Sequence, residues 1–91
     1  MRWRGAMLDI SRHYFDAAFI KKTLSALAIF DYNTLHLHLT DDQGWRLESK
    51  VFPLLHEVGS VRRHSQNNHG LLEPTYDSKE HSGYLTHEDV R

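Results

Sequence analysis

Residues 33–46 read NTLHLHLTDDQGWR, and this stretch decides the fold. From Thr34 to Thr40 leucine alternates with polar residues, which is the period of a β-strand with two different faces. Two carboxylates, Asp41 and Asp42, follow the alternating segment directly. The stretch therefore predicts a strand that places acidic side chains just past its carboxyl end.

A second strand and a helix are predicted before this stretch. Residues 6–10, AMLDI, form a short and mostly apolar run that is typical of a buried strand. Asp16 can cap a helix, and residues 31–33 interrupt the helical periodicity. The apolar face of this helix is expected to consist of residues spaced by three and four, namely Phe19, Ile20, Thr23, Leu24, Leu27 and Phe30. Strand, helix and strand with short joints predict a right-handed parallel βαβ unit.

Such a unit does not cover its own sheet. Two parallel strands and one helix leave sheet edges and an apolar face exposed, so we expect further βα units outside this sequence. Residues 52–55 predict a loop with a short helical turn, and the polar residues 62–83 predict a long loop. Thr86 opens a helix-cap pattern, and the sequence ends at Arg91 before a helix develops. We therefore expect part of a larger α/β domain, with no second domain.

Composition excludes several classes of function. The 91 residues include 11 Lys and Arg against 12 Asp and Glu, a net charge of -1, so nucleic acid is not an expected partner. The absence of cysteine excludes disulfides and thiolate metal sites. No run approaches the roughly 20 apolar residues of a membrane span, and no signal peptide follows Met1. Neither the compartment nor the oligomeric state can be predicted.

Three charged residues are candidates for a functional site. In parallel α/β proteins, functional groups collect past the carboxyl ends of the strands, so Arg12 should lie on the same rim as Asp41 and Asp42. The guanidinium of Arg12 suits either the hydroxyls of a sugar or a structural ion pair with one of the aspartates, and the residues leave both open. The two aspartates should diverge, with one facing the crevice, although a solvated turn is an alternative.

Other side chains have structural alternatives. His36 and His38 share one strand face, and without a third zinc ligand we interpret them as buried structural histidines. Asp9 is hypothesised to lie near one of them and to fix its tautomer. Trp45 either stacks on a sugar ring or wedges its loop against the neighbouring structure. The loop histidines are expected to be exposed to solvent, namely His64, His69 and His81.

Two motifs resemble a known family. Residues 4–15, RGAMLDISRHYF, and residues 33–46 together closely resemble the opening of the catalytic domain of glycoside hydrolase family 20, the β-N-acetylhexosaminidases. Weaker similarity continues through residues 52–55, 58–59 and 82–90. The resemblance implies that residues 1–91 are the N-terminal βαβ portion of a (β/α)8 barrel: the first two strands, the first helix, a long variable loop and the start of the second helix.

The resemblance also implies a reaction. Family members remove terminal N-acetylglucosamine or N-acetylgalactosamine by a retaining route in which the 2-acetamido oxygen of the substrate attacks the anomeric carbon. By this resemblance Arg12 binds hydroxyls of the terminal sugar, Asp41 supports the general acid, Asp42 contacts substrate, and no cofactor or metal is needed. The family's catalytic Asp-Glu pair, in a Gly-Gly-Asp-Glu context, is absent from this sequence.

The chain alone is therefore expected to be inactive, with activity belonging to a longer protein. Two alternatives are a non-catalytic sugar-binding or regulatory remnant and a non-functional or incomplete fragment.

Overall fold

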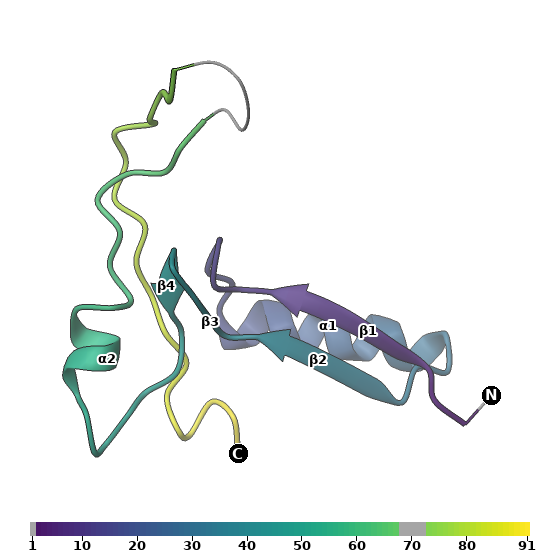
Figure 1. Ribbon diagram of the computed structural model, residues 1–91. Helices are drawn as coiled ribbons and strands as arrows, with labels where there is room; N and C mark the ends of the chain where they lie inside the picture. The colour runs from purple at the N-terminus through teal and green to yellow at the C-terminus, as the bar shows by residue number, and fades with distance from the viewer. Residues whose placement is uncertain (1, 68–72) are drawn as a thin grey trace.

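The computed structural model describes residues 2–67 and 73–91. A strand, a helix and a strand come first, and shorter elements follow (Figure 1). The elements in chain order are β1 (Gly5–Asp9), α1 (Ala17–Ile29), β2 (Thr34–His38), β3 (Thr40–Asp41), β4 (Gly44–Trp45) and α2 (Leu54–Glu57). In these described ranges neither helix has the length and apolar run that crossing a bilayer requires.

Strands β1 and β2 confirm the predicted βαβ unit. They pair in parallel, with Gly5 opposite Thr34 and Asp9 opposite His38. Helix α1 lies across one face of the pair (Figure 1). Because both strands run in the same direction, their carboxyl ends reach the same edge, and the loops that follow them meet there.

The two ends of helix α1 are set by Asp16 before its first turn and by Asp31 just past its last turn. The side chain of Asp16 accepts a hydrogen bond of 2.9 Å from the backbone N–H of Phe19, which satisfies a donor that the first turn leaves free. Ile20 on the inner face is buried. Asp31, just past the helix, has a φ of 58°, a left-handed conformation that aspartate tolerates better than most residues. This residue lets the chain reverse into β2.

The second strand is shorter than predicted. It ends at His38, and the alternating pattern continues into a separate hairpin in which Thr40 lies opposite Trp45 and Asp41 opposite Gly44. The alternation of side chains is the same in both segments, but the backbone changes its partner from β1 to β4. A sequence pattern of period two does not report which strand is the partner, so the hairpin was missed.

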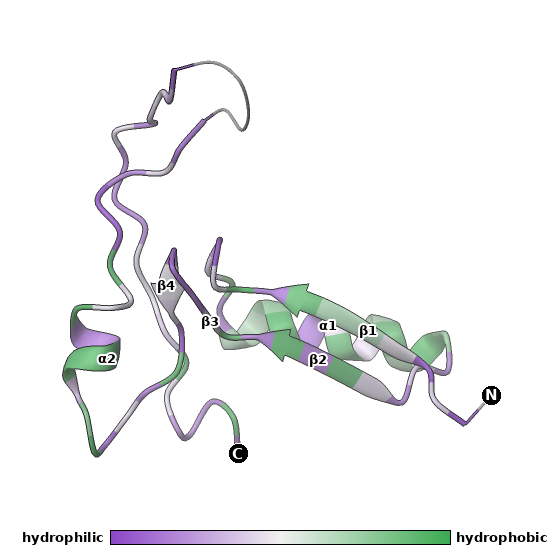
Figure 2. Ribbon diagram, in the orientation of Figure 1, coloured by the Kyte–Doolittle hydropathy of each residue, from purple (hydrophilic) through white to green (hydrophobic). Residues whose placement is uncertain are grey.

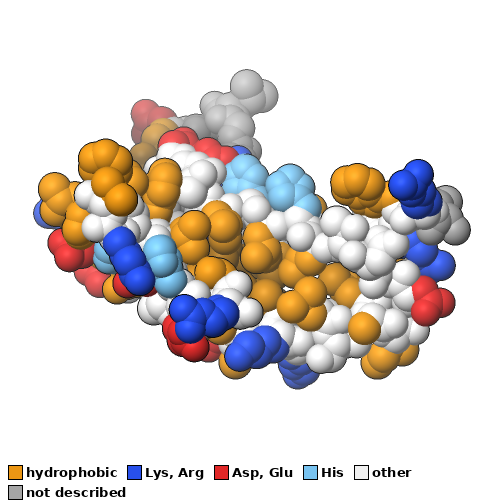
Figure 3. Space-filling view, turned by 90° about the horizontal axis from the view of Figure 1, so that it is seen from below, with side chains coloured by type: hydrophobic (Ala, Val, Ile, Leu, Met, Phe, Trp, Pro, Cys, Tyr) orange, Lys and Arg blue, Asp and Glu red, His pale blue; other side chains and the backbone are white. Residues whose placement is uncertain are grey.

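The described residues bury little apolar surface. The buried hydrophobic residues are Ile10, Ile20 and Leu85. The accessible surface is 7118 Å², against about 5,500 Å² for a compact monomer of this mass. The radius of gyration is 15.3 Å, against about 12 Å for a compact domain of this length. Hydrophobic residues concentrate on α1, α2 and the two long strands (Figure 2), and apolar side chains gather across the middle of one face (Figure 3). Further elements normally cover such a surface in an α/β domain.

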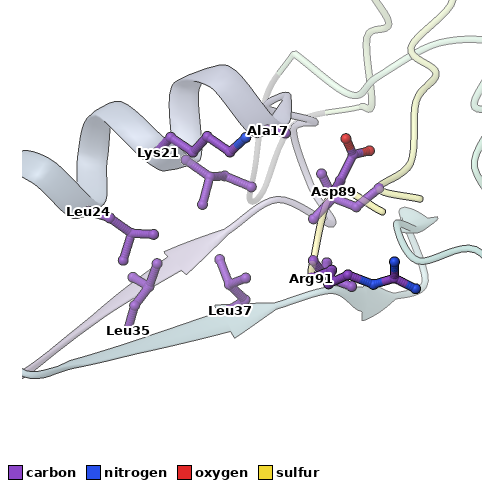
Figure 4. A pocket seen from close by; sticks show the side chains of 10 residues that line it. Ala17, Lys21, Leu24, Leu35, Leu37, Asp89 and Arg91 are labelled. Carbon is purple, nitrogen blue, oxygen red and sulfur yellow. The ribbon is translucent and has the colours of Figure 1, made fainter. Parts of the chain in front are cut away.

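An apolar groove of about 420 Å³ runs between α1 and β2. Leu24, Leu35 and Leu37 line it, and Asp89 and Arg91 stand at one end (Figure 4). The predicted helix-cap pattern borders this groove: the backbone N–H of Thr86 donates to Asp89 Oδ2 at 2.8 Å, and the N–H of Asp89 donates to Thr86 Oγ1 at 3.1 Å. These reciprocal bonds have the form of a capping box.

Candidate functional site

Arg12 and Asp41 meet at the carboxyl edge of the two long strands, as predicted. Arg12 Nη2 donates to Asp41 Oδ2 at 3.0 Å, and Nη1 donates to Asp9 Oδ2 at 2.5 Å. The hydrogen bond to Asp9 is the main cause that raises the pKa of Arg12. The guanidinium is thus held between two carboxylates, while 55% of the side chain stays exposed. It is fixed in place and still accessible from solvent.

Asp9 shapes the loop that carries Arg12. Its Oδ1 accepts hydrogen bonds from the backbone N–H groups of Ser11 at 3.0 Å and of Arg12 at 3.1 Å, which turn the chain at the end of β1. Burial opposes ionisation, but the hydrogen bonds from Arg12 outweigh it, and the pKa of the Asp9 carboxyl is lowered. The hypothesis that Asp9 fixes a histidine tautomer is wrong, because the side-chain hydrogen bonds of Asp9 within the described residues go to Ser11 and Arg12 and the histidine of the rim, His38, contacts Asp41 instead.

Asp41 is the carboxylate that contacts a histidine. Its Oδ2 lies 2.8 Å from His38 Nε2, and its Oδ1 accepts the backbone N–H of Asp42 at 2.8 Å. The hydrogen bond from Asp42 is the main cause that lowers the pKa of Asp41 to about 2, and the bond from His38 follows. Asp41 is therefore an anion throughout the neutral range and accepts from a cation and an imidazole together.

Asp42 lies beside this cluster but outside its ion pairs. Within the described part of the chain it forms no ion pair. Asp42 and Asp41 both line an open groove of about 700 Å³. The other side chains that line this groove are apolar and belong to Trp45, Phe52, Leu54, Leu55 and Val58. Arg12 and Asp41 are thus brought together, and Asp42 lines the groove that Asp41 also borders.

Trp45 is bound to its own chain. Its indole Nε1 donates to the carbonyl of Leu47 at 2.6 Å, and its backbone N–H donates to the carbonyl of Gly59 at 2.9 Å. The first bond fixes the half-buried ring against the following residues of the chain, and the second joins the backbone of Trp45 to the segment just after α2. Of the two alternatives left open for Trp45, this geometry supports the wedge.

Arg46 is a residue that sequence reasoning missed. It is fully buried, and its guanidinium donates to four carbonyls: Ile10 at 3.0 Å, Ser11 at 3.0 Å, Ser60 at 2.7 Å and Gly83 at 2.9 Å. Burial lowers its pKa. No carboxylate of the described residues pairs with it. Arg46 joins the loop that carries Arg12 to two segments far along the chain.

The strand histidines differ from the prediction in part. His38 is half-buried and bound to Asp41, whereas His36 is exposed. The reason is that His36 shares its face of the sheet with Met7, which is 59% exposed. Helix α1 covers the opposite face, so this one stays open in the described structure.

The described part of the long loop contains backbone pairing between its two ends. Arg62 and His81 pair across it, each backbone N–H donating to the other's carbonyl at 2.7 Å. Asp77 Oδ2 lies 2.7 Å from His81 Nε2, and the backbone N–H of Ser65 is the main cause that lowers the pKa of Asp77. His81 is therefore half-buried and paired, and its predicted exposure to solvent is wrong.

The other loop histidines have different outcomes. His64 is exposed, as predicted, and its ring meets the ring of Tyr76 edge-on at 4.5 Å. His69 lies outside the described residues. Within residues 2–67 and 73–91, no three His, Asp or Glu side chains cluster in a way that could hold a metal ion.

Comparison with known proteins gives a consistent result. The family model described as "Glycosyl hydrolase family 20, catalytic domain" matches residues 1–91. The β-hexosaminidase of Vibrio furnissii is 39% identical over 92 residues, which cover 99% of this chain and 14% of that protein. A crystal structure of a β-N-acetylhexosaminidase has a TM-score of 0.83 at 40% identity and covers 97% of this chain and 17% of its own.

A second structure is that of the GH20 exo-β-N-acetylglucosaminidase from Vibrio harveyi in complex with N-acetylglucosamine. Its TM-score is 0.81 at 38% identity, and the match covers 98% of this chain and 14% of that one. This chain therefore spans less than a fifth of each of these proteins. The relatives are glycosidases, and the family model covers every residue from 1 to 91. The chain belongs to glycosyl hydrolase family 20, whose catalytic domain it matches along its whole length.

Proposed function

We propose that these 91 residues supply part of the active site of a β-N-acetylhexosaminidase, which hydrolyses terminal non-reducing N-acetyl-D-hexosamine residues from N-acetyl-β-hexosaminides. The observation that supports this most is the half-exposed guanidinium of Arg12, held between Asp9 and Asp41 at the carboxyl edge of parallel strands. Residues 1–91 then form the first βαβ unit of a (β/α)8 barrel, and the later units complete the site.

Arg12 has the donors that this role needs. Two of its guanidinium nitrogens are engaged with Asp9 and Asp41, which leaves other N–H groups for the ring hydroxyls of a terminal sugar. The carboxylates hold the side chain in advance, so little rotational freedom is lost when a sugar binds. A relative solved with N-acetylglucosamine supports an aminosugar as the ligand.

Asp41 and Asp42 take different roles in the proposal. Asp41, charged and bound to His38, belongs to the hydrogen-bond network that supports the general acid. Asp42, which lines the apolar groove together with Asp41, contacts substrate. The substrate's own 2-acetamido oxygen attacks the anomeric carbon with retention, so the enzyme supplies no nucleophile. The acid that protonates the leaving oxygen belongs to the Asp-Glu pair, which this sequence lacks, so the 91 residues alone are inactive.

A non-catalytic sugar-binding chain would use the same Arg12 and Asp41. It would require the 91 residues to fold alone, and the exposed apolar surface argues against that. Catalysis within a longer protein is therefore the better-supported function.

The Arg12→Ala change tests the proposal in a protein of the relatives' length that contains this chain. We expect the KM for an aryl N-acetyl-β-glucosaminide to rise about 10- to 100-fold, because hydrogen bonds to a charged group are each worth about 1.5–3 kcal/mol. The kcat should change much less. Steady-state kinetics measure both. Lys22→Ala, an exposed cation on α1, is the control and should leave KM unchanged. An unaltered KM in the Arg12 variant would remove Arg12 from the sugar site.

A further inference from the structure

Arg62, at the start of the long loop, contacts both loops of the rim. Its Nη2 donates to the carbonyl oxygen of Arg12 at 2.9 Å, and its Nη1 donates to the carbonyl oxygen of Gln43 at 2.9 Å. Arg12 lies on the loop after β1, and Gln43 lies in the turn between β3 and β4, next to Asp42. One guanidinium therefore bridges the two loops that carry the candidate site.

The contacts of Arg62 indicate that it fixes the distance between the two loops and does not neutralise a carboxylate. In the described ranges no carboxylate forms an ion pair with it, and its third acceptor is the hydroxyl of Ser65 at 2.9 Å. A planar guanidinium that donates to two carbonyls fixes their separation, whereas a lysine ammonium would hold them less rigidly. The uncharged acceptors mean that the loss of Arg62 leaves no carboxylate unpaired.

The position of Arg62 is itself fixed. Its backbone pairs with His81 through two hydrogen bonds of 2.7 Å, and His81 is held by Asp77. The backbone of Arg62 is thus fixed at the start of the loop, while its side chain extends to the rim and contacts Arg12 and Gln43. Arg46 secures the carbonyls of Ile10 and Ser11 just before Arg12, so the two arginines hold successive residues of the same loop.

Arg12, Gln43 and Arg62, the residues of this bridge, line one pocket. The pocket has a volume of about 400 Å³, and the loop contributes His64, Ser65 and Tyr76 to it. The bond of 3.0 Å between Arg12 Nη2 and Asp41 Oδ2 spans the same two loops. That bond keeps its length only while the loops keep their separation.

We propose that Arg62 is a positioning residue for substrate binding: it holds the Arg12 loop against the Asp41 hairpin and makes the paired segments around Arg62 and His81 a determinant of sugar affinity. The inference rests on the proposed role of Arg12. Arg62 then affects the affinity for substrate through the placement of Arg12, without contacting the substrate itself.

The test uses three variants of the longer protein. Arg62→Met keeps the length of the side chain and removes its donors, so the KM for an aryl N-acetyl-β-glucosaminide should rise about 10-fold with little change in kcat, because Arg12 is present but less well placed. Arg62→Lys keeps the charge and lacks the fork, so its KM should stay raised. Arg63→Met, at the adjacent exposed arginine, should leave KM unchanged.

The double variant Arg12→Ala with Arg62→Met separates positioning from general stability. If Arg62 acts through Arg12, the second change adds nothing to the KM of the Arg12→Ala protein. A lower melting temperature and kcat with an unchanged KM would show a merely structural role and overturn the inference, as would effects on KM that add fully. A wild-type protein that hydrolyses no N-acetylhexosaminide would instead overturn the proposed function and, with it, any role of Arg62 in substrate affinity.

Discussion

The Asp41→Ala change should lower the kcat of the longer protein about 100-fold on an aryl N-acetyl-β-glucosaminide. A general acid is typically worth about 10²–10⁴-fold, and we assign to Asp41 the support of that acid, so its loss removes part of the effect. The KM should rise as well, because Asp41 also holds Arg12 through the 3.0 Å bond. Initial rates at several substrate concentrations separate the two effects.

Asp42→Ala is the matched control for this prediction. The backbone N–H that Asp42 donates to Asp41 survives the change, so the loss should appear in KM and not in kcat. Equal losses of kcat in both variants would remove the special role of Asp41. Because its pKa is lowered from 3.8 to about 2, the ion pair of Asp41 with Arg12 is fully present above about pH 4 and is lost only as the pH falls toward 2. The acid limb of activity should therefore not titrate with Asp41.

The Arg46→Met change should destabilise the longer protein by about 3–5 kcal/mol. Each buried carbonyl that loses its donor costs about 1–3 kcal/mol, and Arg46 donates to four carbonyls, but partial relaxation of the structure recovers some of the total. Urea unfolding measures the free energy of unfolding, and the change should lower the midpoint of the transition. The segments that separate are those carrying Ser11, Ser60 and Gly83.

Arg63→Met, on the exposed surface, serves as the reference and should change the free energy of unfolding by less than about 0.5 kcal/mol. Arg46→Lys should fall between the two, because lysine has donors but lacks the planar fork. If Arg46→Met is as stable as the reference, the four carbonyl bonds are not what holds the rim together.

The βαβ unit could be predicted because its signals are local. These signals are the strict alternation from Thr34, the cap at Asp16 and the apolar spacing between them. Each depends on residues that lie within a few positions of one another in the chain. The shared rim could be predicted for a related reason: parallel strands bring their carboxyl ends to one edge, so Arg12 was expected near Asp41 and Asp42, whereas which aspartate pairs with it was left open.

What was missed depends on contacts between distant segments. Nothing in the spacing of Arg46 separates it from a surface arginine. Its burial depends on carbonyls that lie far apart in the chain, such as those of Ile10 and Gly83. It also depends on Gly44, because a Cβ at that position would lie 2.8 Å from the guanidinium carbon of Arg46. The pairing of His81 with Asp77 is likewise set by a fold of the loop that its polar composition does not reveal.

Whether residues 1–91 supply only part of a β-N-acetylhexosaminidase site can be measured as hydrolysis of an aryl N-acetyl-β-glucosaminide. The purified 91-residue chain is compared with a version extended through the later strands of the catalytic domain. We expect the extended version to release N-acetylglucosamine and the 91-residue chain to release none, because Arg12 would bind the sugar and Asp41 would support the general acid, but the acid itself is absent from the chain. A folded extended version without activity, or a 91-residue chain that turns over, would contradict this expectation.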